Sequence, residues 1–312
     1  MFIVSVINYK GGVGKTTITA NLSAELALRG YRVLMIDLDP QANLTFSFVR
    51  PEIWASKYST SKTIKDWYES FENRKIQDLT KLIVTPTKVQ QKLLHNGRLD
   101  LIASHLDLIN IDLELAQELG GSSLRQVKRN FLKVHRRLAE GTNQLESQYD
   151  IVIIDCPPNF NIVTKTAIVA STHLLIPARA DYLSTIGIDY LSRQLKKLIE
   201  DYNDFIEMDN NPSEKKISPE ILGVVFNMIQ IYSAEPISMS RLHIKQTKNL
   251  GLHVFKTFIR ENKTLHSEAA QYGIPVTLNL YGSDTAKNIV DEIKTFVNEF
   301  EEKLNLQVQE YL

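Results

Sequence analysis

The residues best suited to chemistry form a short glycine-rich segment near the start of the chain. Its sequence is Lys10-Gly11-Gly12-Val13-Gly14-Lys15-Thr16-Thr17. Glycines allow backbone N–H groups to converge on phosphate oxygens, and the N-terminal end of a following helix adds a positive potential. In such a loop, Lys15 is placed to reach the β- and γ-phosphates, and the Thr16 hydroxyl is placed to bind Mg²⁺. The segment therefore predicts a phosphate-binding loop for a nucleotide.

A second lysine distinguishes this loop from the general pattern. The pattern G-x-x-x-x-G-K-[ST] has glycine where this chain has Tyr9, and Lys10 adds a surplus charge. A lysine this early in the loop cannot easily turn back onto its own phosphate. We therefore expect Lys10 to cross an interface and neutralise a nucleotide held by another subunit.

The neighbouring segments supply the elements that must position this loop. Residues 2–7 are apolar and rich in β-branched side chains, which predicts a buried strand. Residues 16–29 predict a helix, and residues 32–36 predict the next strand. Strand, loop, helix and strand is the context that a phosphate-binding loop requires.

Strands and helices continue to alternate, which predicts an α/β fold: a doubly wound, mostly parallel sheet flanked by helices. Further strands are expected at residues 100–103, 151–154, 173–177, 222–227 and 253–259. Further helices are expected at residues 65–71, 108–119, 124–138, 163–171, 189–202, 238–250 and 285–304. Residues 46–63 are expected to form a long loop and residues 209–219 a polar linker. We expect one domain over residues 1–312, with a variable loop and helical insertion at about 46–100.

Composition excludes several classes of protein. Hydrophobic residues make up 43% and charged residues 23% of the chain, as in an ordinary soluble protein. The single cysteine, Cys156, excludes a disulfide framework and a cysteine-built metal site. The sequence shows no signal peptide, and its longest uncharged runs, 166–178 and 221–234, are too short to span a bilayer. We therefore expect a cytoplasmic protein.

Three ordered motifs resemble the ParA/MinD superfamily of ATPases with a deviant Walker A motif. The loop at 10–17 is the first of them. Residues 37–45, Asp-Leu-Asp-Pro-Gln-Ala-Asn-Leu-Thr, are similar to the family's D-x-D-P-Q-x-N-x-T motif, and residues 149–158 to its Walker B strand, Y-D-x-x-I-I-D-x-P-P. Residues 259–262 and 273–276 resemble its C-terminal nucleotide-side loop, and with the Asp-Pro-Gln motif they favour the ParA branch. Because the sequence starts at the first strand, the helix-turn-helix extension of larger ParA proteins is not expected.

The resemblance implies an ATPase that uses ATP and Mg²⁺. Asp39 aligns with the hydrolytic aspartate that orients the attacking water, and Lys10 with the signature lysine that contacts the partner's nucleotide in an ATP-sandwich dimer. The implied catalytic set is Lys10, Lys15 and Asp39. The expected Mg²⁺ shell contains Thr16, Asp39 and Asp155, with Asp155 acting through water. Asp37 lies two residues before Asp39 on a strand and is expected either to assist this shell or to make a capping or turn contact.

The base of the nucleotide is expected to meet residues from later in the chain. Asn227 stands where relatives often use an amide side chain, and Arg260 and Asn262 lie in the loop expected to pack on adenine. Many ParA-like proteins have Pro-Arg-Asn in that loop, whereas this chain has Arg-Glu-Asn at 260–262 and one extra residue before Glu268.

Two basic clusters are candidates for DNA contacts, because lysines and arginines suit phosphate contacts that carry no sequence information. With a net charge of +0, DNA binding must come from such local patches. The candidates are Arg193, Lys196 and Lys197, and Arg241, Lys245 and Lys248. A further run is Arg125, Lys128, Arg129, Lys133, Arg136 and Arg137. The alternative for all three is a solvated helix face.

The leading hypothesis is a ParA-type ATPase that binds non-specific DNA as an ATP dimer and positions cargo on the nucleoid. The cargo is a plasmid, a chromosome or a protein body such as a carboxysome, reached through a ParB-type or analogous adaptor that stimulates hydrolysis. A MinD-like membrane ATPase is the alternative, but residues 291–312 carry six acidic and two basic side chains, which anionic lipid repels. A ligase related to dethiobiotin synthetase needs no Lys10, and a bacterial tyrosine kinase needs a C-terminal tyrosine cluster where this chain has Tyr311.

Overall fold

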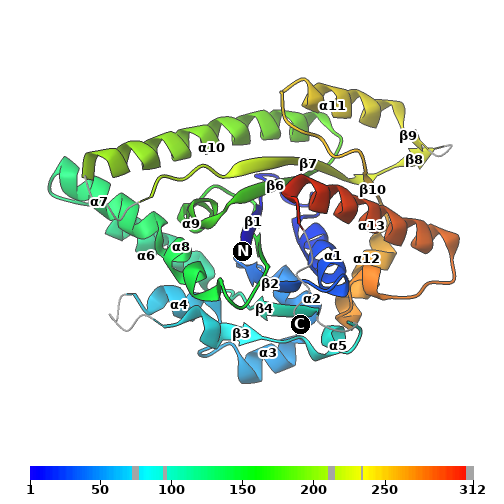
Figure 1. Cartoon of the computed structure of the whole chain (residues 1–312), viewed down its shortest axis with the longest axis horizontal. Helices are drawn as coiled ribbons and strands as arrows, with labels where there is room; N and C mark the ends of the chain where they lie inside the picture. Colours follow the sequence, from blue (N-terminus) through cyan, green and yellow to red (C-terminus); the bar gives the residue numbers. More distant parts are fainter. Residues whose placement is uncertain (72–76, 94–96, 210–214, 233–234, 307–312) are drawn as a thin grey trace.

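The architecture is a layered α/β structure (Figure 1). The computed structural model describes residues 1–71, 77–93, 97–209, 215–232 and 235–306. Within them, eight strands form one sheet in the order β10-β7-β6-β1-β5-β2-β4-β3. The strands are β1 (Phe2–Val6), β2 (Arg32–Asp37), β3 (Ile83–Val84), β4 (Arg98–Ile102), β5 (Ile151–Asp155), β6 (His173–Ala178), β7 (Glu220–Ile229) and β10 (Ile259–Arg260). All pairings are parallel except that of β3 with β4, so the predicted mostly parallel sheet is confirmed.

The strand order places a crevice beside β1. The chain leaves β1 for β2 and β4, returns to β5 between β2 and β1, and then forms β6 on the other side of β1. In open α/β sheets, ligands bind outside the carboxyl ends of the strands where the order reverses. The register aligns these ends, because Asp155 pairs with both Val6 and Asp37. Three strands therefore deliver their last residues to one edge.

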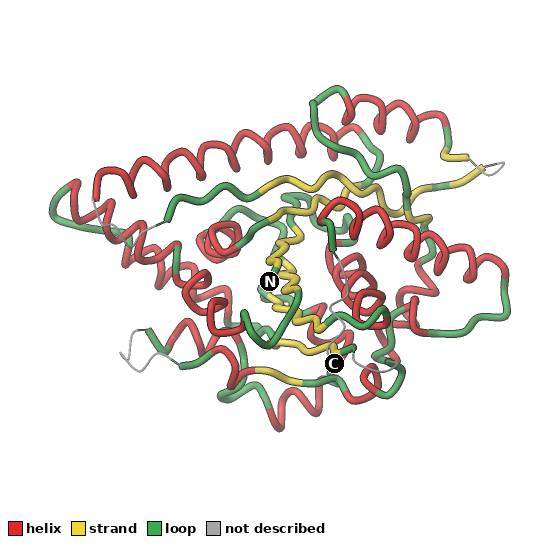
Figure 2. The backbone as a smooth tube through the Cα atoms, in the orientation of Figure 1, coloured by secondary structure: helices red, strands yellow, loops and turns green. Residues whose placement is uncertain are grey.

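Helices cover both faces of the sheet (Figure 2), as the doubly wound prediction requires. One face carries α1 (Lys15–Leu28) and α13 (Asp284–Leu304), and the other carries α9 (Ile162–Ala170) and α10 (Tyr182–Asp209). The remaining helices are α2 (Asn43–Phe48), α3 (Pro51–Lys57), α4 (Ile64–Glu69), α5 (Thr87–Gln90), α6 (Leu108–Glu118), α7 (Leu124–His135), α8 (Arg137–Thr142), α11 (Ser238–Lys248) and α12 (Lys263–Tyr272). None of the described helices is long and apolar enough to cross a membrane.

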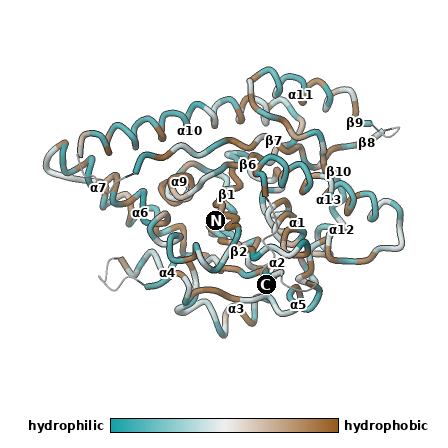
Figure 3. The backbone as a smooth tube through the Cα atoms, viewed as in Figure 1, coloured by the Kyte–Doolittle hydropathy of each residue, from teal (hydrophilic) through white to brown (hydrophobic). Residues whose placement is uncertain are grey.

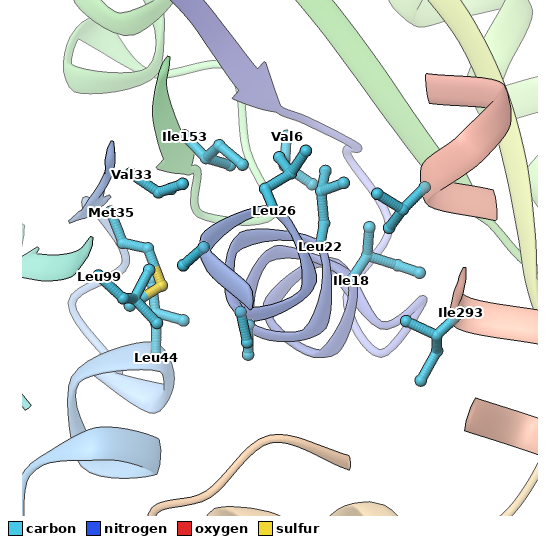
Figure 4. Packing of buried hydrophobic residues seen from close by; sticks show 14 of the residues in the cluster. Val6, Ile18, Leu22, Leu26, Val33, Met35, Leu44, Leu99, Ile153 and Ile293 are labelled. Atoms are coloured by element: carbon cyan, nitrogen blue, oxygen red, sulfur yellow. The ribbon is translucent and has the colours of Figure 1, made fainter. Parts of the chain in front are cut away.

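Alternation along the strands builds two cores. Successive side chains of a strand point to opposite faces, so Val4 and Val6 pack in the cluster that contains α1, whereas Ile3 packs in the cluster on the other face. Figure 4 shows α1 in the first cluster. Its side chains Ile18, Leu22 and Leu26 lie between Val6 of β1 and Ile293 of α13. Hydrophobic colour follows the central strands and hydrophilic colour recurs along the outer helices (Figure 3). The phosphate-binding loop is therefore anchored to a largely buried strand and a largely buried helix, β1 and α1.

Several predicted elements differ from the structure. The expected loop at 46–63 contains α3, whose first residue is Pro51, a position where proline is tolerated because the missing N–H has no helical partner. The expected helix at 124–138 is interrupted, since α7 ends at His135 and α8 begins at Arg137. Arg137 is 2% exposed and turns inward to pair with Glu118.

Other boundaries also shift. The helix expected at 189–202 is the 28-residue α10, which begins at Tyr182. Of the strand expected at 253–259, only Ile259 belongs to a strand, β10, while Val254 forms a lone bridge to Val224. The two-residue strands β3, β8 (Ile231–Tyr232) and β9 (Glu235–Pro236) are too short to show alternation and were not predicted. The expected linker at 209–219 lies partly outside the described residues.

Candidate nucleotide site at the carboxyl ends of the central strands

The glycine-rich loop joins β1 to α1 at the crevice. Gly12 and Gly14 have φ values of +70° and +87°, which L side chains rarely adopt. A Cβ on Gly14 would lie 1.9 Å from Nδ2 of Asn227. This glycine is therefore required both by its backbone conformation and by the close approach of β7.

Asn8 and Lys15 hold the loop in shape. The Asn8 side chain donates to the carbonyl of Pro177 at the end of β6 (2.7 Å) and accepts from the backbone N–H of Lys10 (2.9 Å). Lys15 is 6% exposed and donates to the carbonyls of Asn8 (3.2 Å) and Lys10 (3.4 Å). Burial lowers the pKa of Lys15, against the opposing attraction of Asp155 and Asp39. The ammonium therefore lies inside the loop, where an anionic ligand would gain most from it.

Asp155 at the end of β5 binds the first turn of α1. Its carboxylate accepts from Oγ1 of Thr16 (2.8 Å) and from Oγ1 of Thr19 (3.2 Å). Burial raises the pKa of Asp155, while the Thr16 hydrogen bond opposes that shift. Thr19 was not predicted, although its position three residues after Thr16 places both hydroxyls on one helix face. The arrangement joins Thr16 and Asp155, two of the three residues that were predicted to bind Mg²⁺.

Asp37 makes the turn contact that was one of its two expected roles. Its buried carboxylate accepts from the N–H of Asp39 (3.1 Å) and from the N–H and Oγ1 of Thr45 (2.8 and 2.7 Å). Burial, followed by repulsion from Asp155, raises the pKa of Asp37. These bonds fasten residues 39–45 to the end of β2.

Asp39 lies at the mouth of this turn. Its carboxylate accepts from the N–H of Gln41 (2.9 Å), and its carbonyl accepts from Oγ of Ser104 (2.7 Å). Ser104 was not predicted as part of the site; it follows β4 and so reaches the same edge of the sheet. The side chain of Asp39 faces the cleft with one carboxylate oxygen held in place.

A cleft of about 790 Å³ lies over the loop. The predicted residues that line it are Gly11, Gly12, Gly14, Lys15, Thr16, Thr17, Asp39, Asn227, Arg260 and Asn262. Val13 is fully buried, so its side chain points into the core. Lys10 and Asp155 lie outside the lining, and Asp155 reaches the cleft through Thr16. The structure thus gathers residues from four distant segments around one cavity.

The residues predicted to meet the base have partners within the chain. Asn227 donates to the carbonyl of Val13 (3.4 Å). Nε of Arg260 donates to Glu292 of α13 (2.6 Å), and Oδ1 of Asn262 accepts from the N–H of Leu265 (3.0 Å), which caps α12. These contacts fix the wall of the cleft, and the base contacts themselves stay predictions.

Lys10 does not line the cleft and pairs with Asp181. Its Nζ lies 2.8 Å from both carboxylate oxygens of Asp181 and 3.3 Å from Oγ of Ser184. Asp181 also accepts from the N–H of Ser184 (2.8 Å) at the start of α10. Neither partner was predicted; the only sequence signal is the Asp-x-x-Ser spacing of a helix start. Lys10 is therefore held by its own chain.

The two basic clusters lie on adjoining helices, because α11 packs against α10 (Figure 1). All six side chains are exposed: Arg193, Lys196, Lys197, Arg241, Lys245 and Lys248. Some have acidic neighbours, since Arg193 pairs with Asp189 and Arg241 with Glu235. In the run at 125–137, the buried Arg137 is not available to a ligand. The structure thus places the first two clusters on two helices that pack against each other.

The donor set fits Mg²⁺ better than a transition metal. No group of three or more His, Cys, Asp or Glu side chains placed to hold a metal occurs among the described residues. Thr16, Asp39 and Asp155 offer hard oxygens at one edge of the cleft, and Mg²⁺ typically takes one or two carboxylates, substrate phosphates and waters.

Comparison with known proteins identifies relatives along most of the chain. A family model described as an AAA domain matches residues 1–208. The uncharacterized protein MJECL24 of Methanocaldococcus jannaschii is 30% identical over 238 residues, 76% of each chain. The sporulation initiation inhibitor protein Soj of Bacillus subtilis is 28% identical, covering 88% of this chain and 90% of Soj. The chain spans about half of a longer relative, cell division protein PomZ of Myxococcus xanthus, at 32% identity over 64% of this chain and 53% of PomZ.

Solved structures share the fold at lower identity. An ATP complex of a McdA variant from Cyanothece has a TM-score of 0.69 at 21% identity, covering 100% of this chain and 99% of McdA. An AMPPNP-bound putative plasmid partition protein from Borrelia burgdorferi has a TM-score of 0.65 at 21% identity, covering 97% and 99%. Cobyrinic acid a,c-diamide synthase from Mycobacterium smegmatis has a TM-score of 0.60 at 21% identity, covering 87% and 92%. Since a synthase shares this fold, function must be argued from the site.

Proposed function

This chain belongs to the ParA family of P-loop ATPases, and we propose that it hydrolyses ATP with Mg²⁺ to position or segregate cargo on DNA. The observation that carries the proposal is the 2.8 Å hydrogen bond from Thr16 to Asp155 beneath the Lys15 loop. It joins the hydroxyl and carboxylate that a P-loop ATPase uses for its metal, at the sheet edge where nucleotides bind.

Hydrolysis of ATP requires charge neutralisation and an oriented water rather than covalent chemistry. In the proposal, the loop amides and Lys15 bind the phosphates, Thr16 and Asp155 hold Mg²⁺, and Asp39 orients the water. Bound Mg²⁺ would supply charge neutralisation at the phosphate oxygens. The hydrogen bond from Gln41 N–H fixes one oxygen of Asp39 and leaves the other for this task.

Lys10 makes the reaction depend on association. In the proposal, ATP closes a sandwich dimer in which Lys10 contacts the partner subunit's nucleotide, and hydrolysis reopens it. The reaction is slow until an adaptor of ParB or analogous type stimulates it. Lys10 lies on the same edge as the cleft but outside its lining, which suits a contact made to a second copy.

The adjoining helices α10 and α11 are the proposed DNA surface. Their exposed lysines and arginines suit contacts to phosphates on non-specific duplex, which would place the protein on the nucleoid. The names of relatives support this class of function: one is a chromosome partitioning protein and another a plasmid partition protein. The proposed cargo is a plasmid, a chromosome or a protein body.

The first experiment measures binding of the Asp39→Ala protein to random-sequence duplex, with ATP or ADP, at two salt concentrations. We expect an ATP-dependent dimer that binds DNA and loses affinity as salt rises. A triple charge reversal at Lys196, Arg241 and Lys245 should abolish DNA binding and leave basal hydrolysis intact.

The matched control reverses three charges elsewhere, at Arg125, Lys128 and Lys133 of α7, and should leave DNA binding unchanged. An ATP dimer that binds no DNA would refute the DNA surface. Absence of ATP binding by the unmodified protein would refute the proposed function as a whole.

A further inference from the structure

His266 stands in the wall of the nucleotide cleft with both ring nitrogens buried. It lies on α12, one helical turn after Asn262. Within the described part of the chain, neither Nδ1 nor Nε2 has a hydrogen-bond partner. Buried polar side-chain atoms in native proteins nearly always have a partner in the protein, in ordered water or in a ligand. The position of the ring indicates that the partner of the two nitrogens is a ligand.

The ring lies between two cavities. One is the nucleotide cleft, and the other is a cavity of about 50 Å³ behind it, lined by Ala20 and Asn21 of α1 and by Pro275. Thr16 and Thr17 line both cavities together with His266. The imidazole therefore packs beside the first turn of α1, at the end of the loop that follows Lys15.

Chain direction identifies the part of the nucleotide that this turn meets. Lys15 is placed for the β- and γ-phosphates, and Thr16 for the metal. Thr17 is the next residue along the chain, and it lines the cleft together with Asn262, which belongs to the loop expected to meet the base. His266 shares both cavities with Thr17 and lies one helical turn after Asn262, so it stands between the residues placed for the phosphates and those expected to meet the base, which is where a nucleotide carries its ribose.

The chemistry of the ring matches a hydroxyl. Burial lowers the pKa of His266 to about 4, so the imidazole is neutral at physiological pH. A neutral imidazole has one N–H donor and one acceptor nitrogen, and a ribose hydroxyl also donates and accepts. A phosphate oxygen only accepts and suits a cationic side chain better.

We propose that His266 hydrogen-bonds a ribose hydroxyl of the bound nucleotide and makes the site prefer ribonucleotides to deoxyribonucleotides. The proposal rests on the proposed ATP site.

The test compares the affinities of ADP, 2′-deoxyADP and 3′-deoxyADP, with Mg²⁺, by calorimetry. ADP contains the same ribose as ATP and is not hydrolysed further. We expect the unmodified protein to bind ADP about 3- to 10-fold more tightly than at least one deoxy analogue, as one neutral hydrogen bond permits. His266→Leu should bind all three with nearly equal affinity, while Thr264→Ala, exposed on the same helix, should keep the preference.

A preference that survives in His266→Leu would overturn the inference and leave the ATP site intact. Failure of the unmodified protein to bind any of the three nucleotides would instead refute the proposed function. If His266→Leu does not fold, ¹⁵N NMR of the unmodified protein decides the matter. The His266 ring signals should shift with ADP and shift less with the discriminated analogue, whereas those of His135, buried in α7 with an unpartnered Nε2, should not move. Unmoved His266 signals would assign its partner as water in the small cavity and overturn the inference.

Discussion

The pairing of Lys10 with Asp181 predicts that Asp181→Asn tightens the proposed ATP-dependent dimer. To reach a nucleotide on a second copy, Lys10 must leave the two carboxylate oxygens that lie 2.8 Å from its Nζ. Asparagine removes the charge but keeps an oxygen that accepts from the Ser184 N–H, so the start of α10 stays capped. The substitution therefore weakens the hold on Lys10 without removing the helix contact.

The size of the change in the dimer's dissociation constant follows from how exposed Lys10 and Asp181 are to water. The side chains of Lys10 and Asp181 are 31% and 39% exposed, so water screens the charges and the pair contributes about 0.5–1 kcal/mol. A two-fold symmetric dimer makes each contact twice. Release of both pairs then changes the free energy of association by about 1–2 kcal/mol, which corresponds to a 5- to 30-fold lower dissociation constant.

Sedimentation equilibrium with a non-hydrolysable ATP analogue measures this constant. Asp189→Asn is the matched control, because it removes another acidic partner from α10, that of Arg193. In a Lys10→Ala background, Asp181→Asn should have no effect. A weaker or unchanged dimer in the single variant would mean that Lys10 does not exchange Asp181 for a nucleotide, and the reasoning would fail.

Three other predictions concern the loop and its carboxylates. Lys15→Ala should abolish ATP binding in calorimetry, because the β- and γ-phosphate charge is then unmatched; unchanged affinity would contradict this role. Gly14→Ala should lower the free energy of unfolding in urea by roughly 2–5 kcal/mol, from its left-handed backbone and the clash with Asn227, whereas Gly12→Ala, which meets no atom within 4 Å, should cost only about 1–2 kcal/mol. Because burial raises the pKa of Asp155, the folded state holds its proton more tightly than the unfolded state, and stability without Mg²⁺ should fall as pH rises from about 4 to about 7. Thermal unfolding should show a shallower fall in Asp155→Asn and when Mg²⁺ with ADP is added; equal slopes in all three samples would contradict the assignment.

Local sequence patterns predicted the elements and contacts that depend on short stretches of the chain. The phosphate-binding loop, the central strands and α13 follow from periodicity and spacing, and Thr16 and Asp155 lie together as predicted because parallel strands end at one edge. Residues 46–63 contain the helix α3 instead of the expected loop, because proline, here Pro51, favours the first position of a helix as well as loops. Local composition does not separate these two uses.

Contacts between distant segments could not be predicted. Asp181 is 171 residues from Lys10, and Asn227 is more than two hundred residues from Gly14, so their meeting depends on strand order and register. No periodic pattern encodes the approach of β7 to the loop. The same holds for His266, which shares a cavity with Thr17 because α12 and α1 both pack against α2.

Three groups of the proposed reaction, the ammonium groups of Lys15 and Lys10 and the hydroxyl of Thr16, each donate a hydrogen bond to an acceptor within the protein. Binding of a ligand to them therefore exchanges one hydrogen bond for another. Lys15 donates to loop carbonyls, Thr16 to Asp155 and Lys10 to Asp181. Exchanges of this kind have small net free energies, because each group loses one partner as it gains another. The first two require only a nucleotide, but the third requires a second copy of the chain. In the proposed reaction, association is therefore the step at which the Lys10 ammonium leaves Asp181 for the nucleotide of the second copy. An adaptor protein that weakens or strengthens the ion pair between Lys10 and Asp181 would then change the rate of hydrolysis without contacting ATP.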